Sequence, residues 1–379
     1  MAQVSIWEKE SFLAPKNIII VGSGFVGLWA AYYLKKYYPK LSVAILDRGI
    51  IPTGASTRNA GFACFGSATE LIADTMHIGE DSMLQIVELR YKGLKKIRKV
   101  FSDEVIDFEE CGGYELLTES QKIDINTFRS NLDWLNRKLK DIIDKPKIFR
   151  LNDTKIKAFG FSGAAHLIEN KYEGQLHSGK LCQALLQLVQ SRGVTVLNNI
   201  EIKSFEKKDG QIELQADRSY RFSADKLLIC TNAFAKQLLP ELNVEPARGQ
   251  VLVTSPIPRL KFKGTFHYDE GFYYFRNLGD RVLLGGARNK AIAEEHTYEL
   301  STTDHIQQEL ERFLREIILP NQTYTIDHRW SGIMGVGDEK NPIVKQITEN
   351  IYCAVRMGGM GVALAPEIGK SVAKIMLSA

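Results

Sequence analysis

The sequence predicts an α/β protein with a doubly wound nucleotide-binding domain and an interleaved α+β domain that carries an antiparallel sheet. The chain has 379 residues, too many for one ordinary core and suitable for two domains of roughly 100 to 200 residues each. A buried-strand pattern near the N-terminus runs into a glycine-rich turn and a helical pattern. Residues 246–329 are expected to supply hairpins, which include residues 281–284 (RVLL) ahead of Gly285 and Gly286.

The first unit of structure is a βαβ arrangement. Residues 17–21 (NIIIV) read as a strand buried on both faces, and Gly22, Gly24 and Gly27 follow it in G-x-G-x-x-G spacing. A helical pattern comes next and Pro39 ends it. Residues 41–46 (LSVAIL) read as a second strand that delivers Asp47, 20 residues after Gly27.

This order of elements predicts a site for an adenine dinucleotide. Gly22 allows the tight turn, Gly24 lets backbone approach a pyrophosphate, and Gly27 lets the helix pack closely on the strand. The N–H groups at the helix start would hold the phosphates, and Asp47 would accept hydrogen bonds from ribose hydroxyls. The motif does not by itself separate FAD from NAD.

Charge and cysteine content exclude several classes of function. The formal net charge is +4 with both signs intermixed, and the basic stretch 91–99 reads as a solvated helix face, so we expect no nucleic-acid partner. Five scattered cysteines indicate no metal site and no disulfide framework, which favours a reducing, cytoplasmic location. We expect no secretory signal, and the glycines within residues 17–34 argue against a transmembrane segment.

Several blocks resemble the D-amino-acid oxidase superfamily of FAD enzymes, in particular its glycine oxidase, sarcosine oxidase and gamma-glutamylputrescine oxidase-like members. The first is GASTRNAGF, within the small-residue stretch 51–70. Others follow in the family's order, at residues 172–196, 226–232 (KLLICTN), 246–250 (PARGQ), 272–288 and 329–376. The resemblance spans nearly the whole chain.

The resemblance implies a set of residues that bind FAD. The first loop would lie along the pyrophosphate and the isoalloxazine ring, and the glycine cluster before the last helix would lie under the cofactor. The implied contacts are Gly22, Gly24, Phe25, Val26, Gly27, Asp47, Arg48, Ser56, Thr57, Arg58, Asn59, Ala60, Gly61, Phe62, Ile202, Thr231, Asn232, Gly332, Gly358, Gly359, Met360, Gly361 and Val362. Arg58 and Ser331 stand roughly where some relatives attach FAD covalently, so we expect non-covalent FAD.

The substrate residues depart from the family pattern. Where glycine oxidases carry arginines for the substrate carboxylate, this chain has Met334 and Gly359. Replacement cations could be Arg58, Arg276, Arg329 or Arg356, since arginine grips a carboxylate with two donors. Tyr273 and Tyr274 lie on the hairpin that should roof the pocket, and strand alternation would point only one of them inward. We interpret His177, at a helix start, as structural.

The predicted function is oxidation of a small amine or amino acid, by hydride transfer from the carbon bearing nitrogen to FAD, with oxygen or a quinone as electron acceptor. Two alternatives are an FAD-dependent 2-hydroxy-acid dehydrogenase and a flavin-binding accessory or RNA-modifying protein. The expected FAD-binding domain comprises residues 1–85, 152–245 and 330–379. The expected substrate domain comprises 86–151, mostly helical, and 246–329, with the pocket between the domains.

Overall fold

The computed structural model describes residues 3–121, 123–217 and 220–378. Two compact units divide the chain. Unit 1 comprises residues 1–57, 179–246 and 334–379, and unit 2 comprises 58–178 and 247–333. These bounds place 58–85, 152–178 and 330–333 in the second unit, whereas the predicted FAD-binding domain included them. The assignment of those domains to FAD and substrate stays a prediction.

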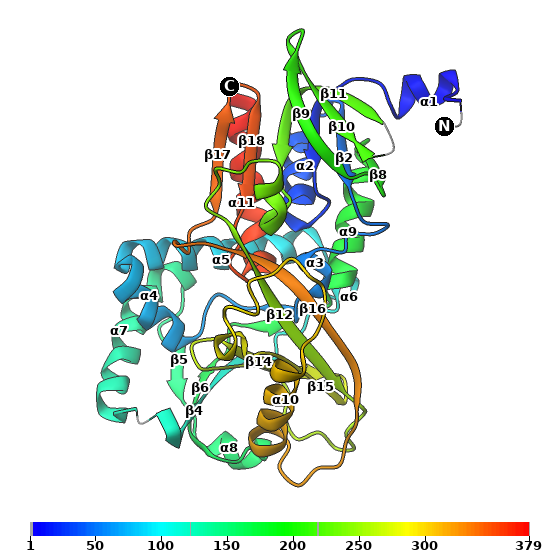
Figure 1. The fold of residues 1–379 in the computed structure, drawn as a ribbon. Coiled ribbons are helices and arrows are strands. Elements are labelled where there is room, and N and C mark those ends of the chain that lie inside the picture. Colours follow the sequence, from blue (N-terminus) through cyan, green and yellow to red (C-terminus); the bar gives the residue numbers. More distant parts are fainter. Residues whose placement is uncertain (1–2, 122, 218–219, 379) are drawn as a thin grey trace. The chain divides into compact units, whose positions relative to one another are not determined.

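Unit 1 is built on a mainly parallel sheet (Figure 1). The strand order is β17-β18-β11-β1-β2-β8, in which β17 alone is antiparallel to its neighbour, and the β9–β10 hairpin joins through β11. The strands are β1 (Lys16–Val21), β2 (Val43–Asp47), β8 (Thr195–Asn198), β9 (Ile202–Lys208), β10 (Gln211–Ala216), β11 (Arg221–Ile229), β17 (Ile343–Thr348) and β18 (Ile351–Val355). The predicted strands 17–21 and 41–46 are therefore confirmed, within two residues.

Different elements pack on the two faces of this sheet. Ile20 points toward the helix side, because its side chain lies 3.3 Å from where a Cβ on Gly27 would stand. Ile19 and Val21 alternate with it and pack in a core cluster with Ile212 and Leu214 of the β-hairpin. The helices of unit 1 are α1 (Ile6–Ser11), α2 (Phe25–Tyr37), α9 (Ser178–Gln190) and α11 (Gly361–Ser378).

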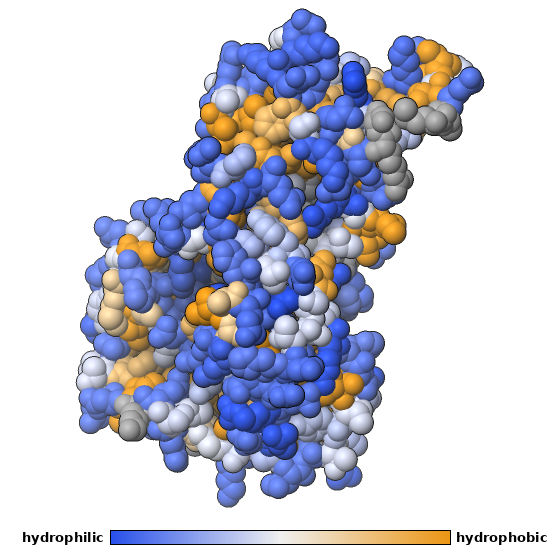
Figure 2. All heavy atoms as spheres, in the orientation of Figure 1, coloured by the Kyte–Doolittle hydropathy of each residue, from blue (hydrophilic) through white to orange (hydrophobic). Residues whose placement is uncertain are grey.

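Helices α2 and α11 pack directly on each other. Gly369 makes this possible, since a Cβ there would lie 2.7 Å from both the Ala30 nitrogen and the Trp29 Cβ. In contrast, α1 has no buried residue. Its Ile6 and Trp7 are exposed, and orange atoms mark this helix in Figure 2.

Unit 2 is built on a second, eight-stranded mixed sheet. Its order is β16-β12-β15-β14-β13-β4-β6-β5. Strands β13 and β4 pair in parallel, whereas β12–β15, β14–β15, β13–β14, β4–β6 and β5–β6 are antiparallel pairs. The strands are β4 (Gly113–Thr118), β5 (Phe149–Leu151), β6 (Ala164–Asn170), β12 (Glu245–Thr254), β13 (Thr265–Tyr268), β14 (Tyr273–Leu278), β15 (Arg281–Gly286) and β16 (Ile326–Val336). The predicted hairpin at 272–288 is β14 and β15.

Helices and a small ladder complete unit 2. The helices are α4 (Ala68–Ile78), α5 (Glu80–Val100), α6 (Asp103–Ile106), α7 (Ile125–Ile143), α8 (Thr154–Phe159) and α10 (Asp304–Phe313). The pair β3 (Phe62–Ala63) and β7 (Gly174–Gln175) is antiparallel. The segment 86–151 is mostly helical as predicted, but it also supplies β4, a central strand of the sheet.

Within the predicted loop 51–70 the chain forms a short helix, α3 (Ala55–Arg58), followed by β3. Four-residue and two-residue elements leave no periodic pattern in the sequence, so the loop interpretation missed them. The described helices include none that is long and apolar enough to cross a bilayer.

Candidate FAD and substrate sites

The glycine turn after β1 fits the predicted motif in detail. Gly22 has φ +107°, a region that favours glycine, and a Cβ there would lie 2.9 Å from the Cys230 carbonyl oxygen. A Cβ on Gly27 would collide with the Gly22 carbonyl oxygen. Both positions therefore need glycine so that β1 can turn tightly into α2.

The helix after the turn starts earlier than the sequence pattern indicates. It begins at Phe25, with Gly24 as an N-cap that supplies no side-chain bond. Ser56 Oγ accepts the Phe25 N–H at 2.9 Å and lies 3.0 Å from where a Gly24 Cβ would stand. Because Gly24 has no side chain that could cap the helix, the helix start can direct further N–H groups of its first turn toward a phosphate group.

Asp47 and Thr231 flank this turn within unit 1. Asp47 Oδ2 accepts from the Ser23 N–H at 2.7 Å and the Ser23 hydroxyl at 2.6 Å, and its Oδ1 accepts the Gly49 N–H at 2.8 Å. A carboxylate has about four acceptor positions, so room is left for a ribose hydroxyl. Thr231 Oγ1 is buried without a partner among the described residues, and its backbone nitrogen lies near Gly22. These residues fit an adenine dinucleotide.

Other predicted cofactor residues of unit 1 lie in the turn before α11, and Asn232, after β11, bonds to the start of this turn. Asn232 Oδ1 accepts the N–H groups of Arg356 at 3.1 Å and Met357 at 3.3 Å, which ties the two strand ends together. Met334 Sδ lies 3.3 Å from where a Gly359 Cβ would stand. Gly358 and Gly359 are exposed, Met360, Gly361 and Thr57 are half-buried, and Val26 and Val362 are buried.

Two predicted contacts also have structural roles. The Arg48 guanidinium stacks 3.7 Å from the centre of the Phe234 ring. Ile202 is buried in the core cluster beneath the β-hairpin.

In unit 2 the loop from Arg58 to Phe62 is held by strand β16. The Trp330 indole N–H donates to the Arg58 carbonyl at 2.9 Å, and Arg58 Nη1 donates to the Ser331 carbonyl at 2.9 Å. A Cβ on Gly332 would lie 3.0 Å from the Arg58 Cβ. Residues 330–332 (WSG), within the block 329–376, therefore support this loop.

Asn59 shapes the same loop from inside. Its Oδ1 accepts the Gly61 N–H at 2.8 Å and the Ser178 hydroxyl at 2.6 Å. Ala60 is buried in a small cluster that includes Phe62 and Tyr274. His177 is exposed and its N–H donates to the Ile106 carbonyl.

Arg276, on β14, is a buried cation beside this loop. It is 6% exposed, and its Nη2 lies 3.2 Å from where a Gly61 Cβ would stand. Its Nε has no hydrogen-bond partner among the described residues. Burial lowers the pKa of the guanidinium to about 10, so it keeps its charge at neutral pH.

The other predicted cations are engaged with protein groups. Arg329 is exposed and donates to Gln307 and, at 2.6 Å, to Glu311. Arg356 is buried and donates to the carbonyls of Asn341 at 2.9 Å and Asn243 at 3.0 Å, and to Glu339. Of the four predicted cations, Arg276 alone is both buried and left with an unpartnered donor within the described chain.

The two hairpin tyrosines point to opposite faces of the sheet. Tyr273 packs in the core cluster beside α10, and its hydroxyl donates to Glu309 at 2.6 Å. Tyr274 packs on the other face, with its ring 6.0 Å from that of Phe62, and burial raises the pKa of its hydroxyl to about 12. Tyr274 therefore shares the face of Arg276.

The same face carries buried acids that the sequence interpretation missed. Glu115 on β4 and Glu173 before β7 are 2% and 3% exposed, and His267 lies on β13. Burial raises the pKa of Glu115 to about 7 and of Glu173 to about 8. For Glu115, a charged residue inside an otherwise apolar strand was the available signal. In the described chain no group of three His, Cys, Asp or Glu side chains is arranged to hold a metal ion.

The doubly wound unit, with its glycine turn and Asp47, defines the chain as a dinucleotide-binding protein. Residues 17–375 match the family model described as DAO, FAD dependent oxidoreductase. The chain belongs to this family of FAD-dependent oxidoreductases.

Individual relatives have low sequence identity, but their alignments cover most of this chain. The chain is 21% identical to sarcosine oxidase subunit beta of Rhizobium meliloti, over 91% of this chain and 80% of that protein. It is 20% identical to the mitochondrial L-2-hydroxyglutarate dehydrogenase of Bos taurus, over 83% and 70%. The crystal structure of L-proline dehydrogenase from P. horikoshii superposes with a TM-score of 0.76 at 19% identity, covering 97% of this chain and 94% of that one.

Proposed function

We propose that this oxidoreductase oxidises a small amino acid at the carbon bearing nitrogen, with the substrate carboxylate held by Arg276. The observation that carries the proposal is the buried, incompletely bonded guanidinium of Arg276 beside the loop Arg58–Phe62. A buried charge without a partner is costly, by several kcal/mol. An anionic group of the substrate would supply the missing partner in two parallel hydrogen bonds.

FAD would be held, without a covalent bond, by the turn Gly22–Gly27, Asp47 and Thr231 described above. When bound, it supplies the acceptor for the hydride equivalent that leaves the substrate carbon. The chain's own residues position the donor: Arg276 would fix one end, and the apolar surface of Tyr274 and Phe62 would exclude water from the reacting carbon.

A carboxylate clamp does not by itself separate amino acids from 2-hydroxy acids. The likeness to sarcosine oxidase subunit beta favours a C–N donor, and the likeness to L-2-hydroxyglutarate dehydrogenase keeps the hydroxy acid as the second candidate. The buried acids Glu115 and Glu173 suit either donor, because each donor loses a proton on oxidation and a carboxylate with a raised pKa can take it up in its ionised form.

The first experiment is anaerobic flavin bleaching by matched donors. The FAD-loaded protein is mixed with N-methyl amino acids, D- and L-amino acids, the corresponding 2-hydroxy acids, and the same amines without the carboxylate. We expect reduction by one group of amino acids and not by the hydroxy acids. Bleaching by hydroxy acids alone would transfer the assignment to the second candidate, and no bleaching by any donor would refute both.

The second experiment tests the clamp. Arg276→Met should weaken binding of carboxylate-bearing donors by about 1.5–3 kcal/mol, roughly 10- to 150-fold in Kd, and Arg276→Lys should recover part of this loss. Donors without the carboxylate should bind both forms equally. Arg137→Met, at an exposed position of α7 in the same unit, is the matched control. An unchanged Kd in Arg276→Met excludes Arg276 as the clamp.

A further inference from the structure

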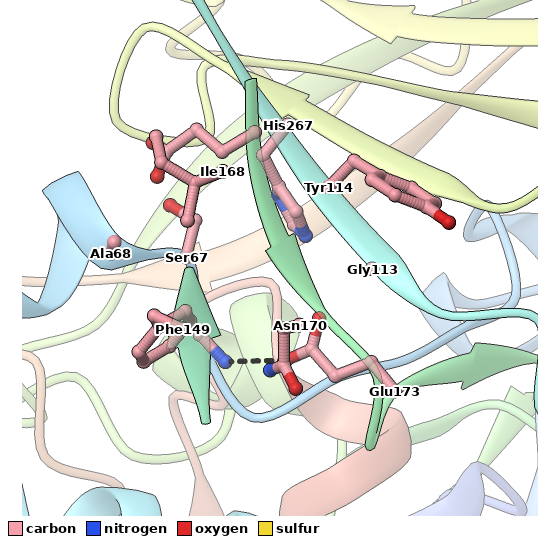
Figure 3. Close-up of a pocket in the computed structure, with 11 residues that line it drawn as sticks. Ser67, Ala68, Gly113, Tyr114, Phe149, Ile168, Asn170, Glu173 and His267 are labelled. Carbon is pink, nitrogen blue, oxygen red and sulfur yellow. Dashed lines mark hydrogen bonds between the residues drawn. The ribbon is translucent and has the colours of Figure 1, made fainter. Parts of the chain in front are cut away.

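A small cavity with both apolar and polar lining residues lies on the Arg276 face of the unit 2 sheet (Figure 3). Its lining includes Glu115 and Gly113 of β4, Asn170 at the end of β6, His267 of β13 and Glu173. The cavity volume is about 10 Å³, about the space that one water molecule needs. Figure 3 shows the His267 ring and the Asn170 side chain directed toward the same space between the strands.

Three polar atoms in this lining have no partner among the described residues. They are both ring nitrogens of His267, which is 7% exposed, and the Nδ2 of Asn170, which is 3% exposed. A buried donor or acceptor without a hydrogen-bond partner lowers the free energy of unfolding by about 1–3 kcal/mol. These atoms therefore point to a ligand that both donates and accepts hydrogen bonds, as water does and an ammonium ion does not.

Glu173 is built into the cavity wall. Its Oε1 accepts the N–H groups of Phe65 at 2.8 Å and Gly66 at 3.3 Å, and its Oε2 occupies the space that a Cβ on Gly113 would fill. Glu115 is held by Thr69, whose N–H donates to it at 3.1 Å. The charged neighbours on α4 and α5 are Glu70 and Arg90, which pair at 3.2 Å, and the Cys64 thiol lies close to Glu173.

His267 connects this cavity to the surface proposed for the substrate. It stands directly opposite Tyr274 in the β13–β14 pair, and its ring meets the Phe62 ring edge-on at 5.2 Å. Paired residues of antiparallel strands project from the same face. His267 is thus one strand away from Tyr274 and two residues along from the partner of Arg276, Thr265.

We propose that the cavity binds one water molecule and that His267, this water and Glu173 form a relay that accepts the proton released by the substrate ammonium group. This inference rests on the proposed function. In the step, an N–H bond of the ammonium group breaks and its electron pair stays on nitrogen. An O–H bond forms on the Glu173 carboxylate, and no oxidant is consumed.

The chemistry of each relay member suits this role. Burial lowers the pKa of His267 to about 4, so the ring does not trap the proton. It can accept at one nitrogen and release from the other. Burial raises the pKa of Glu173 to about 8, which brings its proton affinity close to neutral pH, where a general base works best.

The test measures the rate of anaerobic flavin reduction against pH for the wild-type holoenzyme, Glu173→Gln and His267→Phe. The wild-type rate should rise with an ionisation near neutral pH. In Glu173→Gln this ionisation should be lost and the rate should fall by about 100-fold or more, since general-base catalysis contributes roughly 100- to 10,000-fold. The Kd of the donor should stay within twofold, because neither residue binds the carboxylate. A rate profile identical to that of the wild type in Glu173→Gln refutes the relay.

A second readout does not depend on turnover. Infrared difference spectra recorded during a pH titration of the resting protein should show two buried carboxylic acid components, one lost near pH 7 (Glu115) and one near pH 8 (Glu173). Only the component lost near pH 8 should be absent in Glu173→Gln. Glu119→Gln, which changes an exposed acid in the same unit, should leave both components in place. Equal bands in wild type and Glu173→Gln refute the assignment. If no amine reduces the flavin at all, the proposed function fails, whereas the titration still reports on Glu173.

Discussion

At the scale of single residues, burial distinguishes functional candidates that the sequence treats as equal. Arg58, Arg276, Arg329 and Arg356 were four equivalent cations in the sequence. Arg329 is exposed and paired with Glu311, and Arg356 is bonded to two backbone carbonyls. The sequence could not separate them, because the partners of each arginine come from distant segments. Only the packing of β14 against the loop Arg58–Phe62 singles out Arg276.

The buried acids give a prediction for the pH dependence of stability. Glu115 and Glu173 have ordinary pKa values of 4.5 that burial raises to about 7 and about 8 in the folded protein. Between these limits the folded state binds more protons than the unfolded state, so the free energy of unfolding falls as pH rises from about 5 to about 8. The loss should be on the order of a few kcal/mol.

Urea unfolding from pH 5 to pH 9 checks this expectation. Glu173→Gln should match the wild type near pH 5 and exceed its stability at pH 9, while Glu119→Gln should follow the wild type throughout. Stability that increases between pH 5 and pH 8 in the wild type, and equally in Glu173→Gln, would show that these carboxyl groups are ionised without cost in the fold.

At the scale of elements, long periodic segments are predictable and short ones are not. Strand β1 (Lys16–Val21) follows the predicted range 17–21 to within one residue, and the segment predicted to be mostly helical contains α7 and most of α5. Helix α2 begins at Phe25, inside the glycine motif, because Gly24 is its N-cap. The hairpin tyrosines illustrate a different limit. Strand alternation predicts that Tyr273 and Tyr274 point to opposite faces of the sheet. Which of the two faces is packed against the core depends on where α10 lies, and Glu309 of α10 accepts the Tyr273 hydroxyl.

Helix α11 packs on α2, the helix that directly follows the nucleotide turn. Gly369→Ala would place a methyl group 2.7 Å from the Ala30 nitrogen and the Trp29 Cβ. We expect overpacking to cost about 1–3 kcal/mol and to lower the thermal midpoint by several degrees. Ser371→Ala, at an exposed position on the same helix, should have little effect. Equal midpoints for the two variants would mean that the helices can separate freely at this point.

At the scale of the whole molecule, the family and the fold class could be predicted from ordered blocks, since the match extends over residues 17–375. The cavity lined by Glu115 and Glu173 could not be predicted from the sequence. Its lining comes from β4, β6, β13 and the segment before β7, which lie together only because β13 and β4 pair in parallel across about 150 residues of sequence. No local pattern predicts such a pairing.

Cofactor binding should raise the stability of the whole chain. Adding FAD to the apoprotein at 100 times its Kd should stabilise the folded state by about 2.7 kcal/mol, visible as a higher thermal midpoint. FMN, which lacks the adenosine half, should stabilise less. Gly27→Ala, whose methyl group would collide with the Gly22 carbonyl, should lose the response to FAD. A wild-type midpoint unmoved by FAD would contradict the assigned cofactor site.

The packing of α11 on α2 also bears on how unit 1 folds. The two helices are far apart in the sequence, and all of unit 2 lies between them. Contacts between such distant segments form slowly, because a long loop must close first. We therefore expect the buried surface of Trp29 and Ala30 to become covered late in refolding.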